Sequence, residues 1–342
     1  MINRLPLVLC LLAGALAAPA SATAKPSVGI SDNRPAMFGD PLFTALGVKQ
    51  VRIVVSYNAV TAGRRGDNEI SDKVGPYIRT ADALGIEPLI AFEHARGNAA
   101  EVCNKARNRR KPQCRLPSVA SYKTEITKFM TQFPTVDTVT PWNESNHYTQ
   151  PTYRNPKRAA QFARTVEQVC RELSRTCTVP TMDILDSGEN QKARRPTFKA
   201  TSKYVKRLRR AYGGKPAVCG IHNYGDVNRF RTTGTRALIK AMNCKRYWLT
   251  GTGGLYDFAS FWTKSTKKVG KCRTSSGCQV KATKYLFNKT LKASKRIDRV
   301  YIYNWFGGSE PRFDAGIVRG GGDSPTSKKR PAYDVIKRYL GA

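Results

Sequence analysis

Short apolar runs alternate with segments of helical periodicity along this chain, and this alternation limits the possible folds more than any other feature. Eight runs rich in Val, Ile and Leu predict β-strands, over residues 27–31, 51–55, 88–92, 136–140, 179–185, 217–222, 247–250 and 300–303. Helical spacing is found after each of them, over residues 41–46, 70–84, 118–133, 156–173, 198–212, 235–242, 280–295 and 331–340. Eight strands separated by helices are what a (β/α)8 barrel requires. A doubly wound sheet would more often stop at about five or six strands and show a glycine-rich nucleotide turn, which is missing after the first strand.

The first 22 residues have the features of a secretory signal peptide. Arg4 precedes an apolar run over residues 5–18, and small residues at positions 20–22 form a typical cleavage site. No later run approaches about 18 uninterrupted apolar residues, so we expect no membrane span. We therefore predict that residues 23–342 form one exported, soluble (β/α)8 domain, extracellular or periplasmic.

The cysteine count agrees with export. Of the nine cysteines, Cys10 lies in the predicted signal, which leaves an even number for an oxidising compartment. The simplest pairing joins neighbours, although the sequence alone does not select it: Cys103 with Cys114, Cys170 with Cys177, Cys219 with Cys244, and Cys272 with Cys278. A metal site is the alternative, but there is no CxxC motif and the chain has only three histidines. We predict disulfide-bearing loops, with no metal and no cofactor.

The full chain of 342 residues has a formal charge of +35, which falls to +34 when Arg4 is removed with the signal peptide and is extreme for an exported domain. Such a field attracts polyanions. The basic residues are spread along the chain and show no nucleic-acid-binding motif, which makes nucleic acid an unlikely partner and a basic scaffold a lesser alternative. An acidic polysaccharide and a role in solubility alone remain equally good explanations. We expect the protein to be a monomer.

The sequence VDTVTPWNESNH, at 136–147, is the most informative stretch for function. Its β-branched run ends at Pro141 and Trp142, so Asn143 and Glu144 come where a strand runs into a loop. In a barrel of parallel strands, the loops after the strands form the face where functional side chains converge. A solvated polar loop is the alternative explanation of these residues.

Asn-Glu after a Trp at this place resembles the acid/base motif of clan A-like retaining glycoside hydrolases, which are (β/α)8 barrels. The resemblance implies that Glu144 is the proton donor and that Asn143 holds the sugar 2-hydroxyl. Other predicted strand ends carry further residues that resemble the substrate-binding set of this clan: Arg52, His94, His222, Tyr224 and Trp305. In the clan, the Trp after strand eight stacks on the sugar ring.

Structural roles for some of these side chains stay open. Arg52 could form a buried ion pair, and His94 could be a hydrogen-bonded loop residue. Trp305 could belong to the core, as aromatic residues more often do. His222 and Tyr224 fit a site better, because they end a strand on the same face as Glu144.

Strand seven departs from the resemblance. It reads YWLTGTGG, and the expected Trp-Leu-Thr-Glu-Thr-Gly-Gly would place the nucleophilic glutamate at Gly251. Retaining enzymes need two carboxyl groups about 5 to 5.5 Å apart, and glycine supplies none. The missing side chain is expected to leave a gap facing Glu144. Other carboxylates on the predicted top face are expected to be solvated or ion-paired: Glu93, Asp186, Glu189, Asp226, Asp257 and Glu310.

The resemblance and the departure together define the functional prediction. We expect a secreted, glycoside hydrolase-like barrel that acts on or binds a polysaccharide, with Glu144 as general acid/base and the usual nucleophile absent at Gly251. The alternative is a catalytically inactive barrel that binds glycan.

Overall fold

The computed structural model describes residues 25–96, 103, 110–186, 198–257, 264–308, 313–320 and 327–342. The predicted signal peptide, over residues 1–22, lies outside this range. Glu189 and Glu310, two of the carboxylates considered as substitutes for the nucleophile, also lie outside it.

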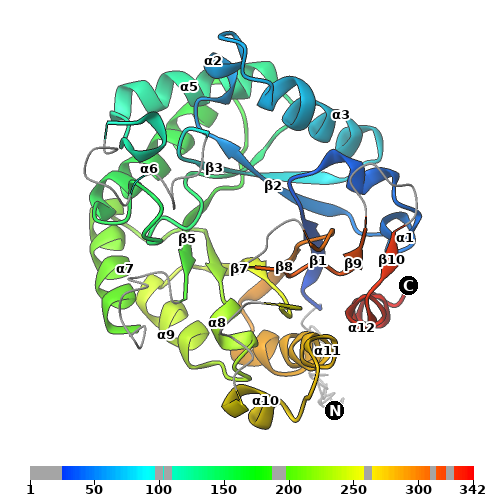
Figure 1. The fold of residues 1–342 in the computed structure, drawn as a ribbon. Coiled ribbons are helices and arrows are strands. Elements are labelled where there is room, and N and C mark those ends of the chain that lie inside the picture. The colour runs from blue at the N-terminus through cyan, green and yellow to red at the C-terminus, as the bar shows by residue number, and fades with distance from the viewer. Residues whose placement is uncertain are drawn as a thin grey trace, which may run out of the picture.

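Eight parallel strands form the centre of the molecule (Figure 1). They are β1 (Ser27–Ser31), β2 (Gln50–Ser56), β3 (Glu87–Glu93), β4 (Thr138–Thr140), β5 (Pro180–Leu185), β6 (Val218–His222), β7 (Arg246–Thr252) and β8 (Ile297–Tyr303). Their hydrogen-bonded order is β4-β3-β2-β1-β8-β7-β6-β5, and a parallel bridge between Thr138 and Thr178 joins β4 to the approach of β5. The ring is thus nearly closed, and the predicted (β/α)8 barrel is confirmed.

Helices surround the ring, as Figure 1 shows. They are α1 (Pro41–Thr44), α2 (Ala59–Gly63), α3 (Gly75–Ala83), α5 (Val119–Gln132), α6 (Pro156–Glu172), α7 (Phe198–Tyr212), α8 (Tyr224–Val227), α9 (Thr233–Met242), α10 (Lys264–Gly270), α11 (Ser275–Tyr285) and α12 (Pro331–Leu340). A hairpin of β9 (Val318–Arg319) and β10 (Lys328–Lys329) precedes α12. Among the described residues, no helix combines the length and apolar character needed to cross a membrane.

Local sequence signals explain where the helices begin. The side chain of Asn155 accepts a hydrogen bond from the Arg158 amide and Pro156 occupies the first turn of α6, as predicted. The predicted helix over 280–295 instead begins at Ser275, because the Thr274 hydroxyl caps it by accepting from the Gly277 amide. It continues through a π turn and a 3-10 turn before β8.

The predicted disulfides are present, and they follow the simplest pairing, which the sequence alone did not select. They join Cys103 to Cys114, Cys170 to Cys177, Cys219 to Cys244 and Cys272 to Cys278. Two of them hold helices close to the barrel. The Cys219 bond anchors β6 to Cys244, two residues after α9, and the Cys170 bond joins the end of α6 to Cys177, which lies shortly before β5.

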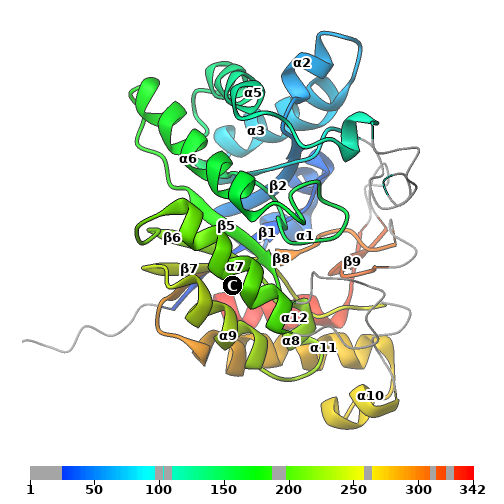
Figure 2. The same ribbon diagram turned by 90° about the vertical axis from the view of Figure 1, so that its left-hand side faces the viewer.

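The two ends of the barrel differ in character (Figure 2 shows the barrel from the side). Near the amino ends of the strands, a buried cluster of Leu89, Val218, Trp248 and Tyr301 fills the interior. The Arg299 guanidinium lies 4.1 Å from the Trp248 ring centre. The carboxyl ends of the strands carry polar side chains instead, and a cavity opens there.

Candidate functional site

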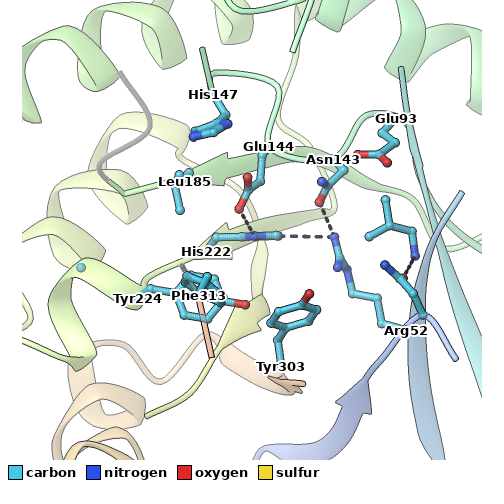
Figure 3. Close-up of a pocket in the computed structure, with 13 residues that line it drawn as sticks. Arg52, Glu93, Asn143, Glu144, His147, Leu185, His222, Tyr224, Tyr303 and Phe313 are labelled. Carbon is cyan, nitrogen blue, oxygen red and sulfur yellow. Dashed lines mark hydrogen bonds and ion pairs between the residues drawn. The ribbon is translucent and has the colours of Figure 1, made fainter. Parts of the chain in front are cut away.

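A cavity of about 410 Å³ lies at the carboxyl ends of the strands (Figure 3). We call it the strand-end cavity. Side chains from β2, β3, β5, β6, β8 and the loop after β4 contribute to its wall. The lining residues are Asn33, Arg52, Val54, Glu93, Asn143, Glu144, His147, Leu185, His222, Tyr224, Gly225, Tyr303 and Phe313. This is the end of a (β/α)8 barrel at which active sites are built.

Glu144 lies at the turn where the chain leaves β4. The amide of Asn143 donates to the carbonyl of Phe92 at 2.6 Å, which keeps the segment attached to β3 beyond the end of the short strand. Glu144 itself has a φ of 45°, a left-handed conformation that is uncommon outside glycine, asparagine and aspartate. Its side chain is 20% exposed, so the carboxylate is mostly buried but remains accessible from the cavity.

A hydrogen-bonded network connects Glu144 to the barrel interior. The imidazole of His222 bridges two carboxylates, since Nδ1 lies 2.8 Å from Glu144 Oε1 and Nε2 lies 3.1 Å from Asp183 Oδ2. Arg52 Nη2 donates to the same Asp183 oxygen at 3.2 Å and to Asn143 Oδ1 at 2.7 Å. Two buried cations therefore face two carboxylates, and the network balances its own charge.

The network shifts the pKa values of its members in a consistent way. Burial disfavours the charged form of His222, but the nearby Asp183 and Glu144 carboxylates outweigh it and raise its pKa to about 9. Burial likewise opposes ionisation of Asp183, yet His222 and Arg52 lower its pKa to about 2. For Glu144, the hydrogen bond and charge of His222 overcome burial and lower the pKa. At neutral pH the bridge is carboxylate, imidazolium, carboxylate.

The His222 ring also occupies the space in front of Gly251. A Cβ placed on Gly251 would lie 2.5 Å from His222 Nδ1 and 2.7 Å from Cε1, closer than real contacts allow. The prediction of an empty gap beside Gly251 is therefore wrong. A side chain at residue 251 fits only if the imidazole moves away from its two carboxylate partners.

Three aromatic rings form the apolar wall of the cavity. The ring of Tyr224 meets that of Phe313 edge-on at 5.2 Å between centres, and Tyr303 lies 6.4 Å from Tyr224 and 6.0 Å from Phe313. Sequence reasoning found Tyr224 but not the other two. Tyr303 is the last residue of the predicted eighth strand, so reading that strand to its end would have found it.

The structure places five of the predicted substrate-site residues together on the cavity wall: Arg52, Asn143, Glu144, His222 and Tyr224. His94 and Trp305 lie elsewhere. His94 is buried, with Nδ1 2.7 Å from the carbonyl of the adjacent Ala95.

Trp305 is a correction to the sequence-based prediction. Its side chain is fully buried, its Nε1 donates to Asp40 at 2.8 Å, and its ring meets Phe43 edge-on at 5.5 Å. The backbone amide donates to Asp32 at 3.0 Å, which holds this residue against the β1 side of the barrel. The indole cannot stack on a sugar, because it presents no face to the cavity.

The other described carboxylates that were considered as substitutes differ in their surroundings. Glu93 lines the cavity. Asp226 pairs with Arg231 at 3.1 Å, as expected of an ion-paired loop residue. Asp186 is buried instead of solvated, and it accepts from the amide of Asp226 at 2.8 Å. Asp257 forms a backbone bridge to Asp314.

Asp183 was missed, although it is the most deeply engaged carboxylate of the site. It lies within β5, is essentially unexposed, and also accepts from the Thr250 hydroxyl. Gly220 makes room for it, since a Cβ there would overlap the Asp183 carboxylate. The available signal was an aspartate inside an apolar strand, which requires a buried partner such as Arg52.

In the part of the chain that the structure describes, no group of three or more His, Cys, Asp or Glu residues is placed to hold a metal ion.

Comparison of the sequence with protein-family models and with curated proteins gives no match. Comparison of the structure gives many. A β-glucosidase from Thermotoga maritima bound to noeuromycin superposes with a TM-score of 0.54 at 11% identity, covering 88% of this chain and 84% of the other. The chain has the fold of (β/α)8 glycoside hydrolases.

Two further enzymes show the same likeness. A psychrophilic family 10 endo-β-1,4-xylanase superposes with a TM-score of 0.54 at 14% identity, covering 92% of this chain and 96% of the other. A variant of Saccharomyces cerevisiae Gas2, bound to laminaritetraose and laminaripentaose, gives 0.50 at 13% identity, with coverage of 93% and 63%. At these identities, the likeness establishes the fold.

Proposed function

We propose that this chain is an exported barrel that binds a polysaccharide in the strand-end cavity without hydrolysing it by the retaining route. The carrying observation is the position of His222, which fills the space in front of Gly251 and forms ion pairs with Glu144 and Asp183. The structural neighbours include a β-glucosidase, an endo-β-1,4-xylanase and a Gas2 variant bound to laminaritetraose and laminaripentaose, which supports a carbohydrate as the ligand.

The electrostatics of the site oppose both halves of a double displacement. A general acid at neutral pH needs a raised pKa, whereas the His222 imidazolium lowers the pKa of Glu144 and keeps it ionised. The imidazole cannot replace the missing nucleophile either. With a pKa of about 9 and a carboxylate at each nitrogen, it has no free lone pair at neutral pH.

The same side chains are well suited to binding. Glu144 offers a carboxylate as a hydrogen-bond acceptor for sugar hydroxyls, and Asn143 adds an amide beside it. The rings of Tyr224, Tyr303 and Phe313 offer apolar surface to the faces of pyranose rings. Because the network is already ionised and hydrogen-bonded, little reorganisation opposes binding.

Calorimetric titration with a panel of neutral oligosaccharides, including xylo- and laminari-oligosaccharides, together with assays for released reducing ends, tests this proposal. We expect binding without hydrolysis. Glu144→Gln should weaken binding by about tenfold, since hydrogen bonds to charged groups are worth about 1.5–3 kcal/mol. Glu172→Gln is the matched control, because Glu172 is an exposed carboxylate paired with Lys123.

Hydrolysis by the unmodified protein that disappears in Glu144→Gln would contradict the proposal and assign Glu144 a catalytic role, with Glu93 as the first candidate for the second carboxylate.

Export is part of the same proposal, and the four disulfides support it. Amino-terminal sequencing of protein recovered from the medium or periplasm should find a chain that begins near residue 23. Retention of residues 1–22 would contradict export through a cleaved signal.

A further inference from the structure

A second pocket, of about 270 Å³, borders the loop that carries Glu144. Asn146 of this loop forms part of its wall, with Arg154 just before α6 and with Lys203, Tyr204 and Arg207 on α7. The helices α6 and α7 lie side by side on the outside of the barrel (Figure 2). We call this the basic pocket.

The basic pocket contains three cations and no compensating anion in the part of the chain that is described. Arg154, Lys203 and Arg207 are exposed, and no carboxylate is among the described residues that line the pocket with them. None of the three forms an ion pair with another described residue. Like charges gathered around one concave surface produce a positive potential that an anionic group relieves.

The basic pocket and the strand-end cavity share a wall. Asn146 hydrogen-bonds the backbone of Leu185 in both directions, at 2.8 and 2.9 Å, and Leu185 lines the cavity. The Tyr204 hydroxyl donates to the carbonyl of Ser145 at 2.8 Å, so α7 also holds the residue that follows Glu144. A linear polymer that fills the cavity can therefore reach the basic pocket by crossing one short, well-anchored loop.

The charges in the two places differ in sign. In the strand-end cavity, Arg52 and His222 balance Glu144 and Asp183, so the carboxylate of Glu93 adds a net negative charge, which disfavours an anionic unit. The hydroxyls of a neutral sugar can still donate hydrogen bonds to the carboxylates there. The basic pocket has the opposite preference. A polymer with a charge on every unit, such as a nucleic acid, fits this pair of sites less well than a polysaccharide with both neutral and acidic units.

We propose that the basic pocket is a subsite for the carboxylate or sulfate group of an acidic polysaccharide whose neighbouring neutral unit occupies the strand-end cavity. This rests on the proposed function and specifies its ligand class. Arginine side chains at the pocket can form paired hydrogen bonds to a planar carboxylate or to a sulfate.

The test uses glucuronoxylan oligosaccharides and hyaluronan hexasaccharides, each beside its carboxyl-reduced form. It also uses carboxyl-reduced chondroitin sulfate hexasaccharides, in which sulfated units alternate with neutral units. The pocket variant combines Arg154→Gln, Lys203→Gln and Arg207→Gln. The control variant combines Lys281→Gln, Lys284→Gln and Lys289→Gln, three exposed lysines on α11 and the turn after it. Both remove the same charge from exposed positions, and thermal unfolding checks that both remain folded.

We expect the pocket variant to lose at least about tenfold in affinity for the acidic oligosaccharide that binds, and the control variant to lose less than about twofold at 0.1 M salt, where distant charges are screened. The carboxyl-reduced forms of glucuronoxylan and hyaluronan should bind both variants alike. Pocket-dependent binding of carboxyl-reduced chondroitin sulfate would assign the subsite to sulfate.

Equal losses in the two variants would overturn the subsite and assign the attraction to the general surface charge. The subsite would also be overturned by equal binding of the acidic and reduced forms of glucuronoxylan and hyaluronan together with no pocket-dependent binding of the reduced chondroitin sulfate. If Glu144→Gln then weakens the binding of both forms, the proposed function still stands. If no oligosaccharide binds the unmodified protein, the proposed function fails. Pocket-dependent binding of a 12-nucleotide single strand in place of any saccharide would identify a nucleic-acid site instead.

Discussion

The resemblance to glycoside hydrolases implies a carboxylate at the ends of both β4 and β7, and the two ends differ in this chain. The β4 end keeps Glu144, with its side chain directed at the strand-end cavity (Figure 3). The β7 end has Gly251, and the volume that a side chain would need there is filled by the His222 ring. A single imidazole connects the two, because it both covers Gly251 and pairs with Glu144.

The comparison shows that the chemistry of one strand end depends on the other. With no anion at residue 251, the His222 cation has Glu144 and Asp183 as its two partners, and this pairing lowers the pKa of Glu144. The carboxyl group of Glu144 is thereby kept ionised, which is the wrong protonation state for proton donation. The following predictions alter one member of this arrangement at a time.

The largest effect is expected at Asp183, which anchors the network beneath both strand ends. Asp183→Asn keeps the size of the side chain but removes the negative charge that faces Arg52 and His222. Removing one partner of a buried ion pair costs about 3–5 kcal/mol, because the remaining charge is buried without compensation. We expect a loss of this size in the free energy of unfolding, measured with urea.

Asp334→Asn is the control for Asp183→Asn. Asp334 is a 40% exposed carboxylate that pairs with Lys329 at 3.0 Å, and exposed pairs contribute about 0–1 kcal/mol. Similar losses in the two variants would mean that the network is solvated, and that His222 does not hold Glu144 in the way described.

The fold was more accessible from the sequence than the site was. Apolar runs and helix caps are local signals, so the strand around residues 51–55 and the α6 start at Asn155 could be predicted. Glu144 was found because it directly follows a strand. Asp183 was missed because its partners, Arg52 and His222, are distant in sequence and come together only when the barrel closes.

Two predictions, for Trp305 and for the space in front of Gly251, were wrong because they depended on side-chain packing, which sequence patterns do not report. Trp305 follows β8 as the resemblance implies, yet hydrogen bonds to Asp32 and Asp40 place it in the core. The space in front of Gly251 was expected to be empty, and only the conformation of the His222 side chain decides that it is filled.

The second prediction concerns pH and separates the charged from the neutral form of His222. Its pKa is raised from 6.5 to about 9 in the folded protein, so its contribution to stability is complete below about pH 6.5. That contribution is lost as the pH rises through about 9, and it amounts to at most about 3 kcal/mol. Urea unfolding of the unmodified protein and of His222→Gln should therefore give curves that converge between these pH values.

The chain has only three histidines, so an NMR titration can assign the effect to one ring. His222 should titrate near pH 9, whereas burial lowers the pKa of His147 below its ordinary value. A His222 ring that titrates at or below pH 6.5 would show that the imidazole is neutral, and Glu144 would then be free to act as an acid.

The smallest effect is expected at the β7 end itself. Gly251→Ala adds one carbon at a position 2.5 Å from His222 Nδ1, so the ring must shift against its two carboxylates. Overpacking of this kind costs about 1–3 kcal/mol.

Gly39→Ala is the matched control, because Gly39 has no atom within 4 Å of an added Cβ and lies outside the left-handed region. There the alanine should be neutral, or should stabilise by up to about 1 kcal/mol through a less flexible unfolded chain. A displaced imidazole should also weaken its hold on Glu144 and move the titration of His222 toward lower pH. If Gly251→Ala is as stable as Gly39→Ala and the His222 titration is unchanged, the imidazole does not fill the space in front of Gly251, and the β7 end is an open gap after all.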